Sequence, residues 1–515
     1  MSLPKALFVT LLSVAAAAQA QTPNPAALYQ QHCSTCHAAN RSGGMGPALL
    51  PENLERLRKP EALRVITEGR IGTQMPAFST TLNKDEIAAL GAWIYSPAPA
   101  LAWNEQDIRA SRIQHTDPKT LADKPVFKAD PMNLFIVVEG GDHHVSILDG
   151  DKLEPIHRFA SRYALHGGPK FSPDGRYVYF ASRDGWISKF DIWNLKLVAE
   201  VRAGINTRNA AVSSDGRYVM VANSLPGNLV LLNADLELLK IIPAQSLDGK
   251  EKSRVSAVYD AAPRRSFVAA MKDMPELWEI SYDENAAPIF DGYVHDYKMK
   301  EGIATPGFLN PRRTRLDAVL DDFFFDQSYR NVMGTSREGH GQVVNLDVRR
   351  KIGDLDLSGM PHLGSGITWQ RDGRTVMAST NLRENAVTVI DMQSWQKIAS
   401  IPTRGPGFFL RSHENSPYAF ADSMMSPEAK DTLYVIDKQS LQVVKELRPE
   451  PGKTLAHVEF TRDGKYALAS LWEMDGALIV YDVATLKEVK RIPMKKPVGK
   501  YNLWNKINRS EGTSH

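Results

Sequence analysis

A repeat of about 45 residues fills most of this 515-residue chain and limits the folds that it can adopt. Each copy contains an apolar strand, an Asp or Asn, a short turn and a second strand, as in "VSILDGDKLEPI", "VTVIDMQSWQKI" and "LIVYDVATLKEV". Neighbouring turn residues lie 42 to 46 positions apart, except for one gap of 114 positions. The turn residues are Asp149, Asp191, Asn233, Asp347, Asp391, Asp437 and Asp482. This spacing predicts an architecture in which each unit packs on the next.

A second pattern indicates what each unit contains. The segments "FSPDGRYVYFAS", "VSSDGRYVMVAN", "WQRDGRTVMAST" and "FTRDGKYALAS" are strand–turn–strand hairpins, each upstream of one of the turns. Four short strands per unit are typical of a propeller blade. Within the long gap, "LWEISYDEN" with Asp283 supplies one further unit, which brings the number to eight. We therefore predict an all-β eight-bladed propeller over residues 117–507, with a seven-bladed ring plus an insertion as the alternative.

The chain has only two cysteines, Cys33 and Cys36, and both lie in "CSTCH" at residues 33–37. A Cys-x-x-Cys followed directly by His is typical of covalent haem attachment. The two thiols would form thioethers with the haem vinyl groups, and His37 would bind the iron. A redox dithiol beside an unrelated His is the alternative.

A candidate for the second iron ligand is Met75, in the irregular segment "TQMPAFS". Asn83 with Glu86 three residues later predicts the start of a helix. Its apolar face contains Ile87, Leu90, Trp93 and Ile94. This pattern resembles the class I c-type cytochromes, a resemblance that implies His37 and Met75 as axial ligands, a pair that favours electron transfer. The alternative for Met75 is a place in the core. We expect a small all-α cytochrome domain over residues 21–98 and a linker over 99–116.

The first 20 residues predict export. One Lys precedes a largely apolar run over residues 6–18, and "AQA" ends at Ala20. These features are typical of a cleaved signal peptide, which implies a periplasmic protein. A membrane anchor is the alternative, but the run is short for a membrane span. The net charge is only +3, without a basic block, so we expect neither a nucleic-acid partner nor stable membrane insertion. After the propeller, we expect residues 508–515 to form a short C-terminal tail.

Several histidines are expected at one mouth of the propeller. If the "DG" turns join the first and second strands of each blade, they lie on one face, and the loops that lead into the first strands lie on the other. His166, His362 and His457 fall in three such loops. The hairpins that open on the same face carry His143, His144 and His340. Histidines around a cavity can bind the iron of a second haem.

A c-type cytochrome joined to an eight-bladed propeller resembles the cytochrome cd1 nitrite reductase family over the whole mature chain. The segments that carry the resemblance are "HGGPKFSPDG", "MPHLGSG" and "GKYNLWNKI". The resemblance implies His166 as the proximal ligand of haem d1 and His362 as a distal residue. It also implies that Arg183 and Arg208 lie near the propionates, where a guanidinium can bind a carboxylate with two hydrogen bonds. For each Arg, an ordinary surface charge is the alternative.

One loop departs from the reductases. Where they carry a distal His, this chain reads "DDFFFDQS", with Phe325 near that position. The chain therefore resembles the NirN-type branch, the dihydro-haem d1 dehydrogenases, which oxidise a propionate to an acrylate in the last step of haem d1 biosynthesis. On this interpretation His457 accepts a proton and Tyr501 is a positioning or acid partner. The alternatives are propionate binding by His457 and core packing by Tyr501.

The same resemblance implies the cofactors and partners. The tetrapyrrole, dihydro-haem d1, is both substrate and precursor of the product haem d1. Electrons pass through one covalent haem c to an external acceptor, and a nitrite reductase could receive the product. Two other functions stay open: a cytochrome cd1 nitrite reductase, and a non-catalytic carrier or electron-transfer protein that binds haem d1.

Overall fold

A computed structural model describes residues 23–54, 57–70, 75–98, 102–290, 304–336 and 338–509. The expected signal peptide, residues 1–20, lies outside the described residues. Within them, no helix combines the length and hydropathy that crossing a bilayer requires.

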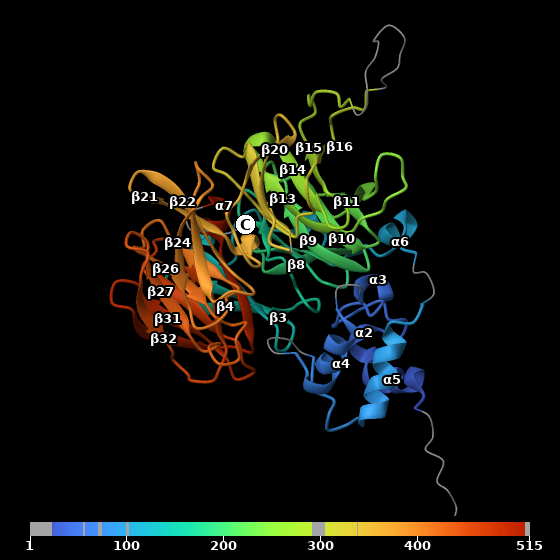
Figure 1. The fold of residues 1–515 in the computed structure, drawn as a ribbon, viewed down its shortest axis with the longest axis horizontal. Helices are drawn as coiled ribbons and strands as arrows, with labels where there is room; N and C mark the ends of the chain where they lie inside the picture. The colour runs from blue at the N-terminus through green and yellow to red at the C-terminus, as the bar shows by residue number, and fades with distance from the viewer. Residues whose placement is uncertain are drawn as a thin grey trace, which may run out of the picture.

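The N-terminal part is helical (Figure 1). Its helices are α1 (Pro25–His32), α2 (Ser34–His37), α3 (Pro51–Leu54), α4 (Lys59–Glu68) and α5 (Lys84–Ile94). The predicted start of α5 is confirmed: Asn83 accepts the backbone N–H groups of Asp85 and Glu86, and the Glu86 carboxylate accepts the N–H of Asn83. Helix α1 packs on α5 through Tyr29, which is fully buried with its ring centroid 4.6 Å from that of Trp93. This contact closes the small domain around the "CSTCH" segment.

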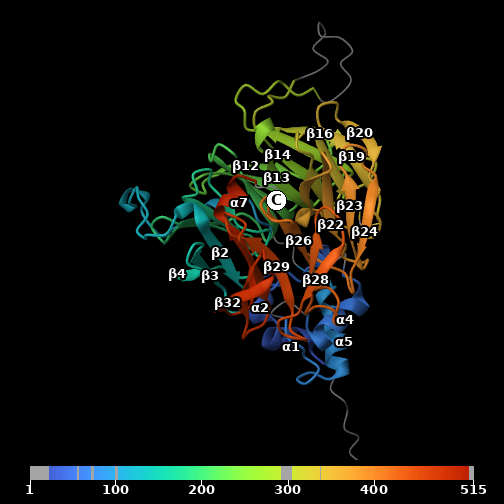
Figure 2. The ribbon, with the colours of Figure 1, turned by 90° about the vertical axis from the view of Figure 1, so that its left-hand side faces the viewer.

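The rest of the described chain forms eight antiparallel sheets arranged as a ring (Figures 1 and 2). The strands of each blade are given from the innermost outward. Blade 1 contains β33 (Pro497–Asn502), β2 (Leu134–Glu139), β3 (His144–Asp149) and β4 (Glu154–Ala160), and blade 2 contains β5 (Lys170–Phe171), β6 (Tyr177–Ala181), β7 (Trp186–Asp191) and β8 (Lys196–Arg202). Blade 3 contains β9 (Asn206–Val212), β10 (Tyr218–Leu225), β11 (Asn228–Asn233) and β12 (Leu238–Pro243), and blade 4 contains β13 (Val255–Ala261), β14 (Ser266–Met271), β15 (Glu276–Ser281) and β16 (Pro311–Arg315). Blade 5 contains β17 (Asp322–Phe325), β18 (Asn331–Thr335), β19 (Gly341–Asn345) and β20 (Arg350–Asp354), and blade 6 contains β21 (Ile367–Arg371), β22 (Arg374–Thr380), β23 (Ala386–Asp391) and β24 (Lys397–Pro402). Blade 7 contains β25 (Leu410–Ser412), β26 (Tyr418–Asp422), β27 (Leu433–Asp437) and β28 (Val443–Leu447), and blade 8 contains β29 (Leu455–Phe460), β30 (Tyr466–Leu471), β31 (Ala477–Asp482) and β32 (Lys487–Pro493).

The prediction of eight blades is confirmed, and the long gap between turns has a simple cause. In blade 4 the third strand, β15, ends at Ser281, and the fourth, β16, begins only at Pro311. An insertion between these two strands separates the turn at Asp283 from its outer strand. The blade itself is complete, with four hydrogen-bonded strands. The seven-bladed alternative is therefore excluded.

Several short elements lie between or beside the blade strands. The two-residue strand β1 (Ile113–Gln114) extends blade 2 on its outer edge, next to β8. Other short elements in the described residues are α6 (Glu105–Ala110), α7 (Leu503–Ile507), η1 (Pro118–Thr120), η2 (Pro131–Asn133), η3 (Ala262–Arg264) and η5 (Leu363–Ser365).

The C-terminal strand closes the ring. Strand β33 pairs antiparallel with β2, with Ile136 opposite Tyr501 and Val137 opposite Lys500. Every residue of β2 is buried, as expected for a strand covered on both faces. Directly after β33, Leu503 of α7 packs into the core of blade 1 and is fully buried. The last residues of the chain therefore complete the first blade.

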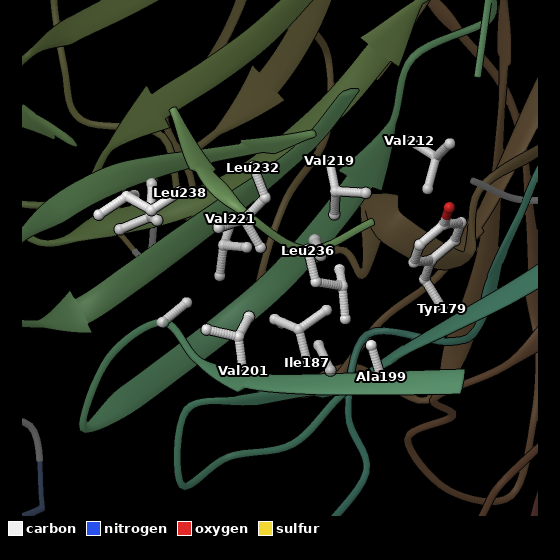
Figure 3. Close-up of a cluster of buried hydrophobic side chains, with 14 of the residues drawn as sticks. Tyr179, Ile187, Ala199, Val201, Val212, Val219, Val221, Leu232, Leu236 and Leu238 are labelled. Carbon is white, nitrogen blue, oxygen red and sulfur yellow. The ribbon is translucent and has the colours of Figure 1, made fainter. Parts of the chain in front are cut away.

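Apolar side chains between neighbouring blades form the propeller core. Figure 3 shows one such cluster, between blade 2 and blade 3. Ile187 and Val201 of blade 2 face Val219 and Val221 of blade 3, and all four are 0–1% exposed. Because each blade packs on both neighbours in this way, the ring depends on all of its members.

The cytochrome domain lies beside the propeller in both ribbon views (Figures 1 and 2). Ala48 and Leu50 of the helical part form one buried cluster with Ile205 of the propeller. The Trp103 indole N–H donates to the Arg202 carbonyl oxygen at 3.0 Å. These contacts hold the haem-attachment segment against the mouth of the ring.

Replacement of Leu503 by Ala tests the importance of ring closure. The variant leaves a cavity where the last helix packs on blade 1, so it should lose about 2–5 kcal/mol of stability, measured from urea unfolding followed by tryptophan fluorescence. Val444→Ala on the outer strand β28, where Val444 is 50% exposed, is the control and should change little. Equal unfolding midpoints for both variants would contradict the account.

Candidate functional site

One cavity of about 650 Å³ connects the cytochrome domain with the propeller mouth. It is lined by ten of the candidate site residues expected from the sequence. These residues are Cys33, Cys36, His37, Met75, His166, Arg183, Arg208, His362, His457 and Tyr501. Residues more than 450 positions apart in the sequence therefore meet in one place, and the two domains share a single site.

The haem-attachment segment presents His37 to this cavity. Its imidazole Nδ1 lies 2.7 Å from the Pro47 carbonyl oxygen and donates a hydrogen bond to it. Nε2 therefore carries no proton, and its lone pair is available to bind a metal. Burial lowers the pKa of His37, which favours the neutral form that binds iron. A Cβ added at Gly46 would come within 2.5 Å of the His37 ring, so only glycine permits this approach. Both thiols are unpaired.

Met75 reaches the same cavity from the segment after α4. The Arg70 N–H donates to the Met75 carbonyl oxygen at 3.1 Å. Gly69 has φ +76°, and an added Cβ would lie 2.9 Å from that same oxygen. These two contacts hold the Met75 carbonyl oxygen close to the end of α4. Two thiols, an imidazole and a thioether fit a covalently attached haem with His and Met axial ligands.

His166 lies in the loop that leads into β5, the innermost strand of blade 2. Its Nδ1 donates to the Arg208 carbonyl oxygen at 2.7 Å, and its Nε2 accepts from the guanidinium groups of Arg183 at 2.9 Å and Arg208 at 3.3 Å. Burial, followed by these two positive charges, lowers the pKa of His166 well below its usual value. The imidazole is therefore neutral, and its Nε2 lone pair points toward the guanidinium groups.

Arg183 and Arg208 line the cavity rather than the outer surface. Within the described residues, no carboxylate oxygen lies within 4 Å of either guanidinium. Burial, with the charge of Arg208, lowers the pKa of Arg183 to about 9. Two partly buried guanidinium groups that face the cavity without a carboxylate partner favour an anionic ligand.

His362 approaches from blade 6, across the ring from blade 2. It is the N-cap residue of η5, in the loop before β21. Its Nδ1 donates to the Phe408 carbonyl oxygen at 2.8 Å, and its ring centroid lies 4.0 Å from that of Phe408. Burial lowers the pKa of His362. Two neutral imidazoles thus reach the cavity from opposite sides of the propeller.

The predicted position of His457 in a loop is wrong, because it lies inside β29, the innermost strand of blade 8. The strand register shifts between Ala456 and Val458, and His457 has φ +50°. Such a β-bulge inserts one extra residue into the strand, and the side chain of that residue departs from the regular alternation between the two faces of the sheet. The Lys500 ammonium donates to the His457 carbonyl oxygen and, at 2.9 Å, to Ser470 Oγ; it lies 3.4 Å from His457 Nδ1.

The surroundings of His457 disfavour its imidazolium form. Burial, followed by the positive charges of Lys500, Arg411 and Lys506, lowers the pKa of His457 well below 6.5. The ring stays neutral at physiological pH, as a proton acceptor requires. The same burial and nearby positive charge disfavour a proton on His457, which makes it a weaker base than an ordinary imidazole.

Tyr501 of β33 lies beside His457, with 5.2 Å between the two ring centroids. Two glycines leave room for the phenol: an added Cβ at Gly499 would lie 2.8 Å from the hydroxyl, and one at Gly168 would lie 3.2 Å from the ring. Burial raises the pKa of Tyr501 to about 12, so its hydroxyl is a hydrogen-bond donor at neutral pH. Tyr501 lines the cavity, in contrast to the core-packing alternative.

The other expected residues are less central. His143 lines the cavity, whereas His340 is solvent-exposed. Phe325 is 3% exposed and packs against Phe323 and Tyr329 in the core. The cavity-lining residue of its segment is Asp322.

Sequence reasoning missed three polar residues near the cavity. The Tyr259 hydroxyl donates to Asp322 Oδ1 at 2.9 Å, and both side chains line the cavity. Lys500 lies behind His457 and is fully buried. Two of the three had a signal in the sequence: Lys500 belongs to the "GKYN" motif that carries the family resemblance, and Asp322 belongs to the "DDFFFDQS" loop.

Comparison with known proteins gives two family matches. The cytochrome D1 heme domain model matches residues 129–299 and 303–506. The model for subunit III of cbb3-type cytochrome C oxidase matches residues 20–94.

Similar proteins cover nearly the whole chain. A dihydro-heme d1 dehydrogenase from Pseudomonas aeruginosa is 54% identical over 98% of each chain. A nitrite reductase from Stutzerimonas stutzeri is 25% identical over 93% of this chain and 92% of its own. The solved structure of dihydro-heme d1 dehydrogenase NirN in complex with DHE is 53% identical, with a TM-score of 0.81, over 94% of this chain and all of that one. From its matched domains and full-length likeness, this chain belongs to the cytochrome D1 heme domain family.

Proposed function

We propose that this protein is a dihydro-haem d1 dehydrogenase that oxidises one propionate of the tetrapyrrole to an acrylate. The observation that carries the proposal is the shared cavity, where a haem-attachment site and a pair of opposed imidazoles lie in one space. The full-length likeness to a dihydro-heme d1 dehydrogenase supports it. Haem c, held by Cys33, Cys36, His37 and Met75, would supply a one-electron acceptor within the same cavity.

The substrate iron would be bound by His166 and His362. Each donates its Nδ1 proton to a backbone carbonyl oxygen, so Nε2 is available to the metal. Binding at His166 displaces the guanidinium groups of Arg183 and Arg208, which are then free to pair with carboxylates of the substrate. Two imidazoles on one iron leave no open position for nitrite, which favours a dehydrogenase over a reductase.

Tyr501 and His457 form the wall that would face the reacting propionate. The oxidation removes two electrons and two protons from adjacent carbons. The Tyr501 hydroxyl, protonated at neutral pH, donates a hydrogen bond to the substrate carboxylate and orients the C–H bonds. Neutral His457 accepts a proton and passes it on, because its imidazolium is disfavoured beside Lys500. Turnover should therefore depend more on Tyr501 than on His457.

Location and partners form part of the same proposal. Export by the N-terminal segment would place the enzyme in the periplasm. There an external one-electron acceptor would reoxidise haem c, and a nitrite reductase would receive the finished haem d1.

Anaerobic conversion of the substrate tests the function. Purified haem c protein is mixed with dihydro-haem d1 and a one-electron oxidant, and the extracted tetrapyrrole is weighed by mass spectrometry. We expect a product lighter by two hydrogens, about 2 Da, because acid–base-assisted oxidation removes two protons and two electrons. A tightly bound but unchanged tetrapyrrole would refute the proposal and favour a carrier, while turnover of added nitrite would identify a reductase.

Two substitutions test the roles in the cavity wall. Tyr501→Phe keeps the ring and removes the hydroxyl, so kcat should fall by about 100-fold or more as the propionate loses its orientation. His457→Gln should cost about tenfold or less, because a weak base contributes little driving force to proton transfer. Anaerobic single-turnover kinetics measure both, and substrate titration by absorbance confirms binding. A larger loss in His457→Gln than in Tyr501→Phe would reverse the assignment.

A further inference from the structure

Asp422 is a buried carboxylate at the end of β26 in blade 7, and only 1% of its surface is exposed. Its oxygens accept the backbone N–H groups of Phe408 at 2.8 Å, Phe409 at 3.3 Å and His457 at 3.3 Å. Within the described residues, no Lys or Arg nitrogen lies within 4 Å of it. Backbone N–H groups therefore stabilise the negative charge of Asp422. They come from two segments of the cavity wall, one with Phe408 and Phe409 and one with His457.

The segment 407–409 also fixes the orientation of His362. The Phe408 carbonyl oxygen accepts the Nδ1 proton of His362 at 2.8 Å and the hydroxyl proton of Thr380 at 3.0 Å. The N–H of Phe408 binds Asp422. Two hydrogen bonds to the backbone of Phe408 thus link the Asp422 carboxylate to the imidazole of His362. Any shift of this segment therefore moves the backbone acceptor that holds the His362 ring.

We propose that Asp422 is a positioning residue that holds His362 in the orientation needed to bind the iron of the tetrapyrrole substrate. This inference rests on the proposed function, since it takes His362 as an iron ligand. Asp422 does not touch the substrate; it acts through the backbone of Phe408.

The electrostatics of Asp422 support a functional role. Burial raises its pKa to about 6, from an ordinary value of 3.8. Because the folded-state pKa is raised, the stability that this group contributes is present at low pH and is lost as the pH rises through about 6. The ionised carboxylate is thus kept at neutral pH at a cost in stability, a pattern typical of functional sites. The charged or titratable groups that face it are Lys500 of β33 and His457 of β29.

Gly407 supplies a second way to move the same segment. A Cβ added there would lie 2.3 Å from the Asp422 carbonyl oxygen and 3.1 Å from Thr380 Cγ2. An Ala at this position must push the segment away from β26, while the carboxylate stays intact. Gly407→Ala therefore displaces the Phe408 carbonyl oxygen without any change in charge.

The test compares Asp422→Asn and Gly407→Ala with a matched control. Asp391 is also a buried carboxylate, and it accepts the N–H groups of Gln393 at 2.9 Å and Ser394 at 2.8 Å in the hairpin between β23 and β24. Asp391→Asn makes the same chemical change away from the cavity. Each holoprotein, with haem c attached, is loaded with ferric dihydro-haem d1, and absorption and electron paramagnetic resonance spectra are recorded.

We expect wild type and Asp391→Asn to show a six-coordinate, low-spin tetrapyrrole iron. Asp422→Asn and Gly407→Ala should lose at least half of that signal, and kcat should fall at least tenfold with a smaller change in KM, because His166 still binds the iron. A purely structural role would lower the unfolding midpoint without changing the spectrum.

The outcomes separate this inference from the function that it rests on. Wild-type spectra in both variants would overturn the role of Asp422 and leave the dehydrogenase proposal intact. If wild type itself lacks the low-spin signal, then His362 is not a ligand and both assignments fail. If Asp422→Asn does not fold, the spectrum of Gly407→Ala decides: a retained low-spin signal overturns the inference.

Discussion

The pairing of β33 with β2 is the interaction on which the rest of the structure depends. It joins the last strand of the chain to the first blade, with Tyr501 opposite Ile136 and Lys500 opposite Val137. Without it, β2 would expose a hydrogen-bonding edge, and the ring would have no last contact. The same strand carries Tyr501, which lines the cavity, and Lys500, which contacts His457 from behind. Closure of the fold and assembly of the site are thus one event, since Tyr501 meets His457 only when the ring is complete.

One hydrogen bond recurs at each histidine that is expected to bind iron. His37, His166 and His362 donate Nδ1–H to the carbonyl oxygens of Pro47, Arg208 and Phe408 at 2.7, 2.7 and 2.8 Å. A backbone acceptor of this kind fixes the tautomer and directs Nε2 at the metal. His457 differs, because its Nδ1 faces the Lys500 ammonium instead. The group next to Nδ1 therefore separates two kinds of histidine: those with a backbone carbonyl there are suited to bind iron, and His457, with Lys500 there, is not held in the same way.

The sequence predicted the repetitive parts of the molecule well and the irregular parts poorly. The spacing of the Asp turns was enough for eight blades, because each blade must repeat one hydrogen-bonded unit. Short motifs located the haem segment, and family resemblance located His166 and His362. The bulge at His457 was missed, since one unpaired residue leaves no trace in a pattern of alternating side chains. Asp422 was missed because its partners are backbone amides, which carry no sequence signal.

The central claim is that substrate and haem c share one cavity, so that electrons pass between them within a single molecule. Rapid mixing of the ferric haem c protein with an excess of dihydro-haem d1, followed at the haem c absorption band, tests it most directly. Haem c should be reduced in a first-order process whose rate constant does not change with protein concentration. Haem c that stays oxidised while product forms, or a rate constant that rises in proportion to protein concentration, would contradict it.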